Sequence, residues 1–138
     1  MKVGLDLALK LIAAARKKAE EIGVPMVIAV VDAGGNPIAL QRMDDALLVS
    51  INIAANKAYT AVAVKIPTHE LAKVAQPGEP LFGIHTTDGC RIVIFGGGYP
   101  LKNGDEIVGG IGVSGGDWET DARLAREAIE AIGAQWSA

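Results

Sequence analysis

Apolar side chains recur at three- and four-residue spacing from the start of the chain, and this period predicts a helix over Val3–Ile22. Lysine and glutamate residues fall between the apolar positions, so the helix is amphipathic. Gly23 and Pro25 are expected to end it, because a glycine after the last turn and a proline shortly beyond are frequent helix stops.

Shorter apolar runs follow, and they indicate strands joined by tight turns. Met26–Val31 is rich in Val and Ile, which is typical of a buried strand. Asp32–Asn36 contains two adjacent glycines that accept positive φ, so this segment predicts a turn. Pro37–Met43 then completes a hairpin.

The second half of the chain predicts three more strands. Arg91–Phe95 is an apolar run that stops at Gly96-Gly97-Gly98. Tyr99–Lys102 and Glu106–Ser114 flank Asn103-Gly104-Asp105, and Asn-Gly is the strongest short-range hairpin signal.

Three further helices are predicted. Ala46–Lys65 lacks glycine and proline and is apolar around most of its circumference, so it is expected to be largely buried. Thr68 is a candidate N-cap for a short helix over His69–Ala75. The last helix is expected over Asp117–Ile132, and its start at Ser114-Gly115-Gly116-Asp117 resembles a capping box.

The predicted element order is α-β-β-α-α-β-β-β-α, in which hairpins dominate. We therefore expect an α+β sandwich with a five-stranded, mainly antiparallel sheet and helices on both faces. The chain has 138 residues, a length that predicts one domain over positions 1–138.

Composition narrows the class of function. Net charge is −3, which argues against a nucleic-acid partner. Cys90 is the single cysteine, so a disulfide framework and a multi-cysteine metal site are excluded, and we interpret its thiol as inert. The apolar run Ala46–Val64 is interrupted by polar side chains, so no membrane span is predicted, and we expect a soluble cytoplasmic protein.

The most informative polar group is Lys57, which lies on the mostly apolar helix beside the stripe formed by Asn52, Asn56 and Thr60. A buried lysine needs a partner or a lowered pKa. The simpler interpretation is a salt bridge to Asp32 or Asp44, and the alternative is a cavity lined by polar groups.

Glycine-rich turns offer a second set of candidates. Gly96-Gly97-Gly98 lacks the lysine and spacing of a phosphate-binding loop, so a strand break or bulge is favoured over a nucleotide site. Backbone N–H groups at Ser114-Gly115-Gly116-Asp117 could hold a carboxylate, although a simple helix cap is the favoured interpretation.

Two histidines, His69 and His85, are the candidate metal ligands. No pair or cluster has zinc-site spacing, but one imidazole is enough to ligate a porphyrin iron. For each residue the alternative is an ordinary surface or hydrogen-bonded histidine.

Several segments together resemble the GlcG/HbpS-like heme-binding family, which includes the C-terminal domain of PduO-type cobalamin adenosyltransferases. The matching segments are Pro25–Asn36, Arg42–Asp44, Asn56–Ala61, Gly83-Ile84, Arg91–Leu101 and Val108–Gly116. The resemblance covers nearly the whole chain and implies a profilin-like α-β-α sandwich, homo-oligomers, and binding of heme or a related tetrapyrrole or corrinoid.

Some members of that family ligate heme through a histidine on the first helix. This chain has Lys10, Arg16, Lys17 and Lys18 as its polar residues there, so an axial role would fall to His69 or His85. We prefer His85 because its surroundings are polar and rich in threonine.

The resemblance and the residues lead to one site hypothesis. The expected cofactor pocket contains Asp32, Lys57 and Arg91 together with Gly96, Gly97 and Gly98, because glycine lets a planar ligand approach the backbone and Arg or Lys can hold carboxylates.

Three functions stay open. They are a binding module for heme or a corrinoid, an accessory protein for dehydratase-associated proteins of glycerol, propanediol or glycolate metabolism, and an enzyme acting on a bound cofactor. Few acid–base groups are present, which disfavours the enzyme. Apolar residues form 50% of the chain, so we expect a homodimer or a higher even-numbered oligomer.

Overall fold

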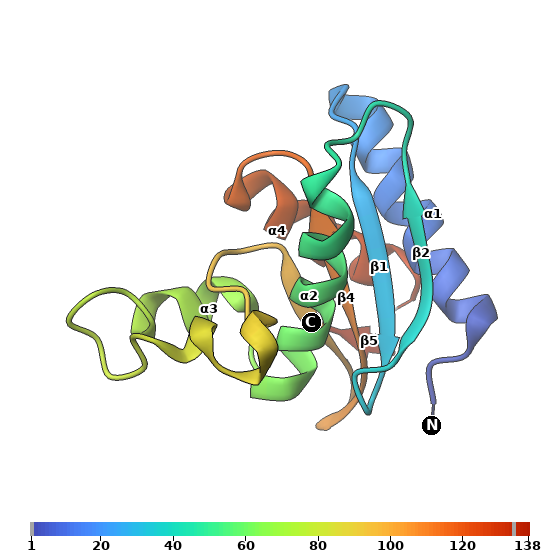
Figure 1. The fold of residues 1–138 in the computed structure, drawn as a ribbon. Helices are drawn as coiled ribbons and strands as arrows, with labels where there is room; N and C mark the ends of the chain where they lie inside the picture. The colour runs from blue at the N-terminus through green and yellow to red at the C-terminus, as the bar shows by residue number, and fades with distance from the viewer. Residues whose placement is uncertain (1, 134) are drawn as a thin grey trace.

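Two helices cover one face of a five-stranded antiparallel sheet and a third covers the other face, as the ribbon in Figure 1 shows. The structure is a computed structural model that describes residues 2–133 and 135–138. Its α-helices are α1 (Leu5–Ile22), α2 (Val49–Val64), α3 (Thr68–Val74) and α4 (Trp118–Ala131), and two short 3-10 helices, η1 (Ile84–Thr86) and η2 (Asp88–Cys90), follow α3. Its strands are β1 (Val27–Asp32), β2 (Pro37–Arg42), β3 (Gly98–Asn103), β4 (Glu106–Ser114) and β5 (Trp136–Ser137).

The strands lie in the order β2-β1-β4-β3-β5, and every neighbouring pair is antiparallel. Successive side chains of β1 alternate between the two faces of the sheet. Ile28 and Val30 join the core beneath α1 and α4, whereas Val27 and Ala29 pack against α2. The predicted α+β sandwich with a five-stranded antiparallel sheet is confirmed.

One predicted strand is wrong. Arg91–Phe95 is irregular, and the fifth strand is β5, which pairs with Lys102 and Asn103 of β3. The backbone N–H of Val93 donates to Thr60 Oγ1 (3.0 Å), and that hydroxyl donates to the carbonyl of Arg91 (3.3 Å). A side chain of α2 therefore takes the hydrogen bonds that a neighbouring strand would have supplied.

Three predicted helix starts are also corrected. Thr68 is the first residue inside α3, and its hydroxyl accepts a hydrogen bond from Gly98 N (3.0 Å) instead of capping the helix. The α4 N-cap is Asp117, whose carboxylate accepts from Thr120 N (2.8 Å), while Ser114 belongs to β4. The middle helix begins at Val49 rather than Ala46.

Close contact between α2 and the sheet depends on glycine. A Cβ atom on Gly112 of β4 would collide with the carbonyl oxygen of Ala54 and lie 2.7 Å from the backbone nitrogen of Ala58. Both neighbours are backbone atoms of the helix, so neither can rotate away. The whole helix would have to move outward to admit a larger residue.

We expect Gly112→Ala to lower the free energy of unfolding by about 1–3 kcal/mol or more, because the added methyl overpacks the helix–sheet contact. Urea unfolding followed by circular dichroism measures the loss. Gly4→Ser is the control, since a Cβ at Gly4 meets nothing within 4 Å and serine is a preferred N-cap. An unchanged midpoint for Gly112→Ala would contradict the contact.

Candidate functional site

A buried ion pair joins α2 to the start of α4. Lys57 is fully buried, and its ammonium donates to Asp121 Oδ2 (3.0 Å) and to the carbonyl of Val113 (2.9 Å). The ring of Phe95 lies 5.1 Å from the Lys57 nitrogen on a third side. Burial lowers the pKa of Lys57, and the negative charge of Asp121 opposes that shift. The predicted partners Asp32 and Asp44 were therefore wrong.

Asp121 also organises the turn that precedes α4. Its carboxylate accepts hydrogen bonds from Gly116 N (2.9 Å) and Gly115 N (3.4 Å). From the sequence, these backbone N–H groups were candidates for binding the carboxylate of a ligand. Because these N–H groups already donate to Asp121, the turn stabilises the buried ion pair.

The glycine segment Gly96-Gly97-Gly98 lies against this pair. A Cβ on Gly97 would approach the Lys57 nitrogen to 2.5 Å, and one on Gly98 would collide with the Lys57 carbonyl. Gly97 has φ +129°, a conformation that favours glycine. Gly97 and Gly98 thus let the chain pass directly over α2. A Cβ on Gly96 would instead meet His69 and Trp118, so this glycine lies beside α3.

An apolar depression, which we call the aromatic cleft, opens next to Gly96. It has a volume of about 340 Å³. Its lining residues are His69, Ala72, Lys73, Gln76, Ile94, Phe95, Gly96 and Trp118. Phe95 is 43% exposed and Trp118 48% exposed, which is high for such large apolar rings. A flat hydrophobic ligand would find two accessible aromatic surfaces here.

The imidazole of His69 lies in the cleft and is partly buried. Its ring is stacked with Trp118 at 6.3 Å and meets the edge of Tyr99 at 5.4 Å between centroids. Burial lowers the pKa of His69, against a smaller opposing effect of Glu70, whose carboxylate lies 3.4 Å from Nε2. The buried Nδ1 atom has no hydrogen-bond partner among the residues that the structure describes. A neutral imidazole is the form that ligates metals.

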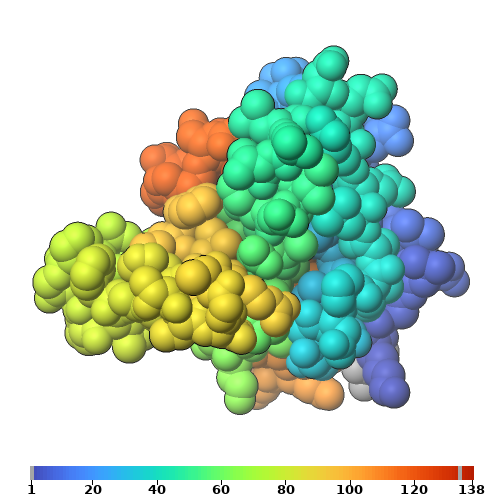
Figure 2. All heavy atoms as spheres, in the orientation of Figure 1, coloured from blue at the N-terminus to red at the C-terminus, as the bar shows by residue number. Residues whose placement is uncertain are grey.

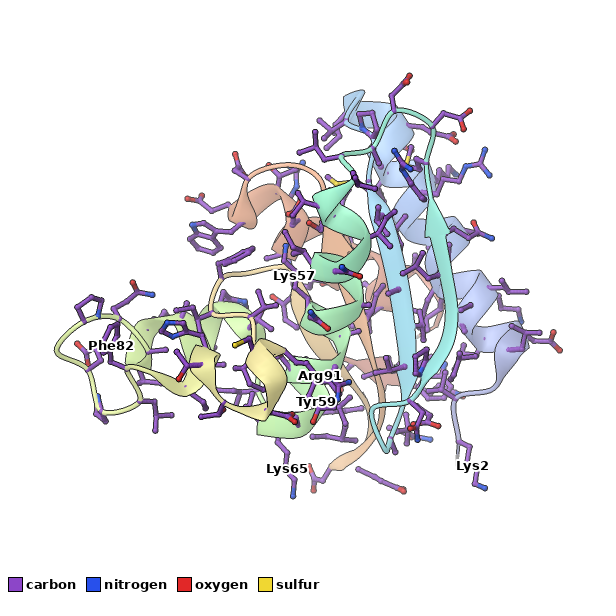
Figure 3. The ribbon with its side chains drawn as sticks, viewed as in Figure 1. Lys2, Lys57, Tyr59, Lys65, Phe82 and Arg91 are labelled. Atoms are coloured by element: carbon purple, nitrogen blue, oxygen red, sulfur yellow. The ribbon has the colours of Figure 1, made fainter. Side chains whose placement is uncertain are left out.

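The other predicted site residues lie elsewhere. Figure 3 shows Arg91 beside Tyr59, with the guanidinium 3.4 Å from the ring centroid, away from Lys57. Asp32 orders the β1–β2 turn, because its carboxylate accepts hydrogen bonds from Gly34 N and Asn36 N (both 2.9 Å). The hydrogen bond from Asn36 N has the largest effect on the pKa of Asp32, which it lowers.

His85 contacts Phe82 (5.7 Å between centroids) in the loop beyond α3. The structure therefore brings Lys57, the three glycines and His69 together, and separates Asp32, Arg91 and His85 from them.

Sequence reasoning missed Phe95 and Trp118. Each belongs to a segment whose place depends on long-range packing, and an aromatic residue alone predicts only core. The sequence feature that could have singled them out is the scarcity of aromatic residues, which form only 4% of the chain.

Residues 2–133 and 135–138 contain neither a cluster of metal-ligating side chains nor a membrane-spanning helix. No three or more His, Cys, Asp or Glu side chains gather where they could hold a metal ion. None of the helices there has the length and apolar character needed to cross a membrane.

The family, sequence and structure comparisons with known proteins agree with one another. The model of a family described as "Haem degrading protein HbpS-like" matches residues 3–130. A Citrobacter freundii protein described as an uncharacterized 15.0 kDa protein in the dhaT-dhaS intergenic region is 47% identical over 128 residues, covering 93% of this chain and 90% of that protein.

The names of two further similar proteins include a ligand. The corrinoid adenosyltransferase PduO of Citrobacter freundii is 49% identical over 119 residues, and the match covers 86% of this chain but only 36% of that enzyme. The crystal structure of a PduOC:heme complex superimposes with a TM-score of 0.92 at 43% identity, covering 96% of both chains.

We expect Lys57→Met to cost about 3–5 kcal/mol of unfolding free energy, because it leaves the Asp121 carboxylate buried without a cation. Chemical denaturation measures the loss. Lys10→Met removes an exposed lysine from α1 and is expected to change stability by at most about 0.5 kcal/mol. Similar losses in the two variants would contradict a special role for the pair.

Stability should also depend on pH through His69. Its folded-state pKa lies below the unfolded value near 6.5, so the unfolded chain binds more protons in that window. The unfolding free energy should therefore rise with pH through the window below about 6.5 and fall as the solution is acidified. His69→Gln should flatten this dependence and His85→Gln should keep it, as measured by urea unfolding at several pH values. An equal slope in wild type and His69→Gln would contradict the assignment.

Proposed function

The chain belongs to the HbpS-like family, and from this premise we propose that it binds heme in the aromatic cleft, with His69 as the ligand to iron. The observation that supports the proposal most directly is the partly buried imidazole of His69, whose pKa is lowered by burial, beside two exposed aromatic rings. Related structures include a heme complex of 43% identity, which favours a tetrapyrrole over other planar ligands.

The chemistry of the cleft fits a porphyrin in three respects. Apolar rings of Phe95 and Trp118 offer stacking surface for a macrocycle. His69 can supply one imidazole nitrogen to iron. Lys73 lies at the cleft with 69% of its side chain exposed, so its ammonium can reach a carboxylate substituent.

This proposal moves the iron ligand from His85, which the sequence favoured, to His69. His85 is not among the residues that line the cleft, and its ring contacts Phe82 in the segment beyond α3. Of the predicted pocket, we retain Lys57, Gly96, Gly97 and Gly98 as the wall behind Phe95, and we leave Asp32 and Arg91 out.

A corrinoid is the second candidate ligand. The PduO relatives are corrinoid adenosyltransferases, and this chain corresponds to about a third of their length.

We further propose that the protein acts without turnover, as a cytoplasmic accessory to dehydratase-associated proteins of diol or glycerol metabolism. We also propose that it forms a homodimer or an even-numbered oligomer. Exposed leucine and valine side chains at the start of α2 support self-association.

Hemin titration tests the proposed function. We expect wild type to give a saturable Soret shift, and His69→Ala to weaken binding about tenfold or more, which corresponds to about 1.4 kcal/mol, and to change the ligand-field bands. His85→Ala is the matched control and should retain both affinity and spectrum. Loss of the spectrum in His85→Ala alone would reassign the ligand, and no saturable shift in wild type would exclude heme. Cobalamin titration of the same proteins tests the corrinoid.

A further inference from the structure

A loop beyond α3 projects from the body of the molecule and ends in exposed apolar side chains. It spans Gln76–Gly83, and Figure 1 shows it as the yellow-green loop that extends away from the sheet. Leu81 is 44% exposed and Phe82 56% exposed. We call this segment the arm and these two residues the arm tip.

Backbone hydrogen bonds connect the arm to the end of α3 and form within the arm itself. Leu81 N donates to the carbonyl of Val74 at the end of α3 (2.8 Å), and Phe82 N donates to the carbonyl of Glu79 (3.1 Å). The Phe82 ring also contacts His85. A preorganised segment loses little conformational entropy when it docks, so exposure of its tip favours binding to a partner.

The arm tip does not cover the aromatic cleft of its own chain. Apart from Gln76 at the base of the arm, the residues that line the cleft lie outside the loop. Figure 2 shows the arm standing out from the remaining surface. One chain therefore exposes both an apolar projection and an apolar depression.

Charge at the two surfaces is complementary. Glu79 is the one acidic residue of the arm, and Lys73 is the lysine that lines the cleft. The Lys73 ammonium lies 3.2 Å from Glu70, and its side chain is 69% exposed, so it can also meet a carboxylate from outside. The apolar surfaces are therefore complementary between two copies of this chain, and Glu79 of one copy can form one additional ion pair with Lys73 of the other.

We propose that the arm tip of a second copy docks in the aromatic cleft. Leu81 and Phe82 would pack against Phe95 and Trp118, and Glu79 would approach Lys73. Because the cleft is also the proposed heme site, the tip and heme compete for one surface, and this regulatory consequence rests on the proposed function. By linkage, hemin then weakens self-association to the extent that self-association weakens hemin binding.

The first test measures mass by light scattering and sedimentation at micromolar concentration without hemin. Wild type is expected to exceed the monomer mass, and the double variant Leu81→Ser, Phe82→Ser to have a smaller mass than wild type. Leu5→Ser, which alters an equally exposed leucine on α1, should keep the wild-type mass. A monomeric wild type, or a double variant with wild-type mass, would overturn the proposal.

A charge exchange tests the pairing independently of the apolar tip. Glu79→Lys should weaken association several-fold, and the combination of Glu79→Lys with Lys73→Glu should recover it. Failure of the combination to recover association would overturn the pairing. Circular dichroism of every variant confirms that the fold is retained.

A photoreactive phenylalanine analogue at position 82 identifies the receptor surface. Cross-links between chains should fall on peptides that contain Phe95 or Trp118, and cross-links confined to other surfaces would overturn the cleft as receptor. Hemin should reduce both the cross-link and the mass. Absence of a Soret shift would reject the proposed function alone, because the mass and cross-linking results are obtained without hemin.

Discussion

The Lys57–Asp121 ion pair is the interaction on which the arrangement of the site depends. An ammonium and a carboxylate are removed from water here, which is costly unless each charge keeps several polar partners. Val113 supplies a carbonyl to the lysine, while Gly115 and Gly116 supply N–H groups to the aspartate. Through these contacts one side chain of α2 fixes the end of β4 and the start of α4.

The position of the aromatic cleft follows from that constraint. Trp118 is the first residue of α4, three positions before Asp121, so the ion pair determines where the indole emerges. Phe95 meets the other side of the pair through its ring face. Gly97 and Gly98 permit this approach because any side chain there would meet Lys57. The glycines that suggested a ligand cradle therefore act by close packing between protein segments.

Local patterns allowed most of the fold to be predicted. Hairpin turns such as Asn103-Gly104 depend on residues adjacent in sequence, and amphipathic periodicity identified α1 and α4 in the same way. Arg91–Phe95 looked like a strand because its composition matches one, yet its hydrogen-bond partner is Thr60, a side chain on a distant helix. Asp121 lies 64 residues from Lys57, so sequence spacing could not identify that pair.

Burial of His69 links the stability of the site to its chemistry. Desolvation disfavours the imidazolium, and a neutral ring presents a lone pair that iron can accept. The helix that carries His69 is short, and its place depends on contacts with other segments, among them the Thr68 hydroxyl bonded to Gly98 N. The opposite wall, at Trp118, is fixed by the buried ion pair. A ligand in the cleft would therefore contact two parts of the molecule. One is the body formed by the sheet and its helices, the other is the α3 segment with its arm, and both would contribute to the binding energy.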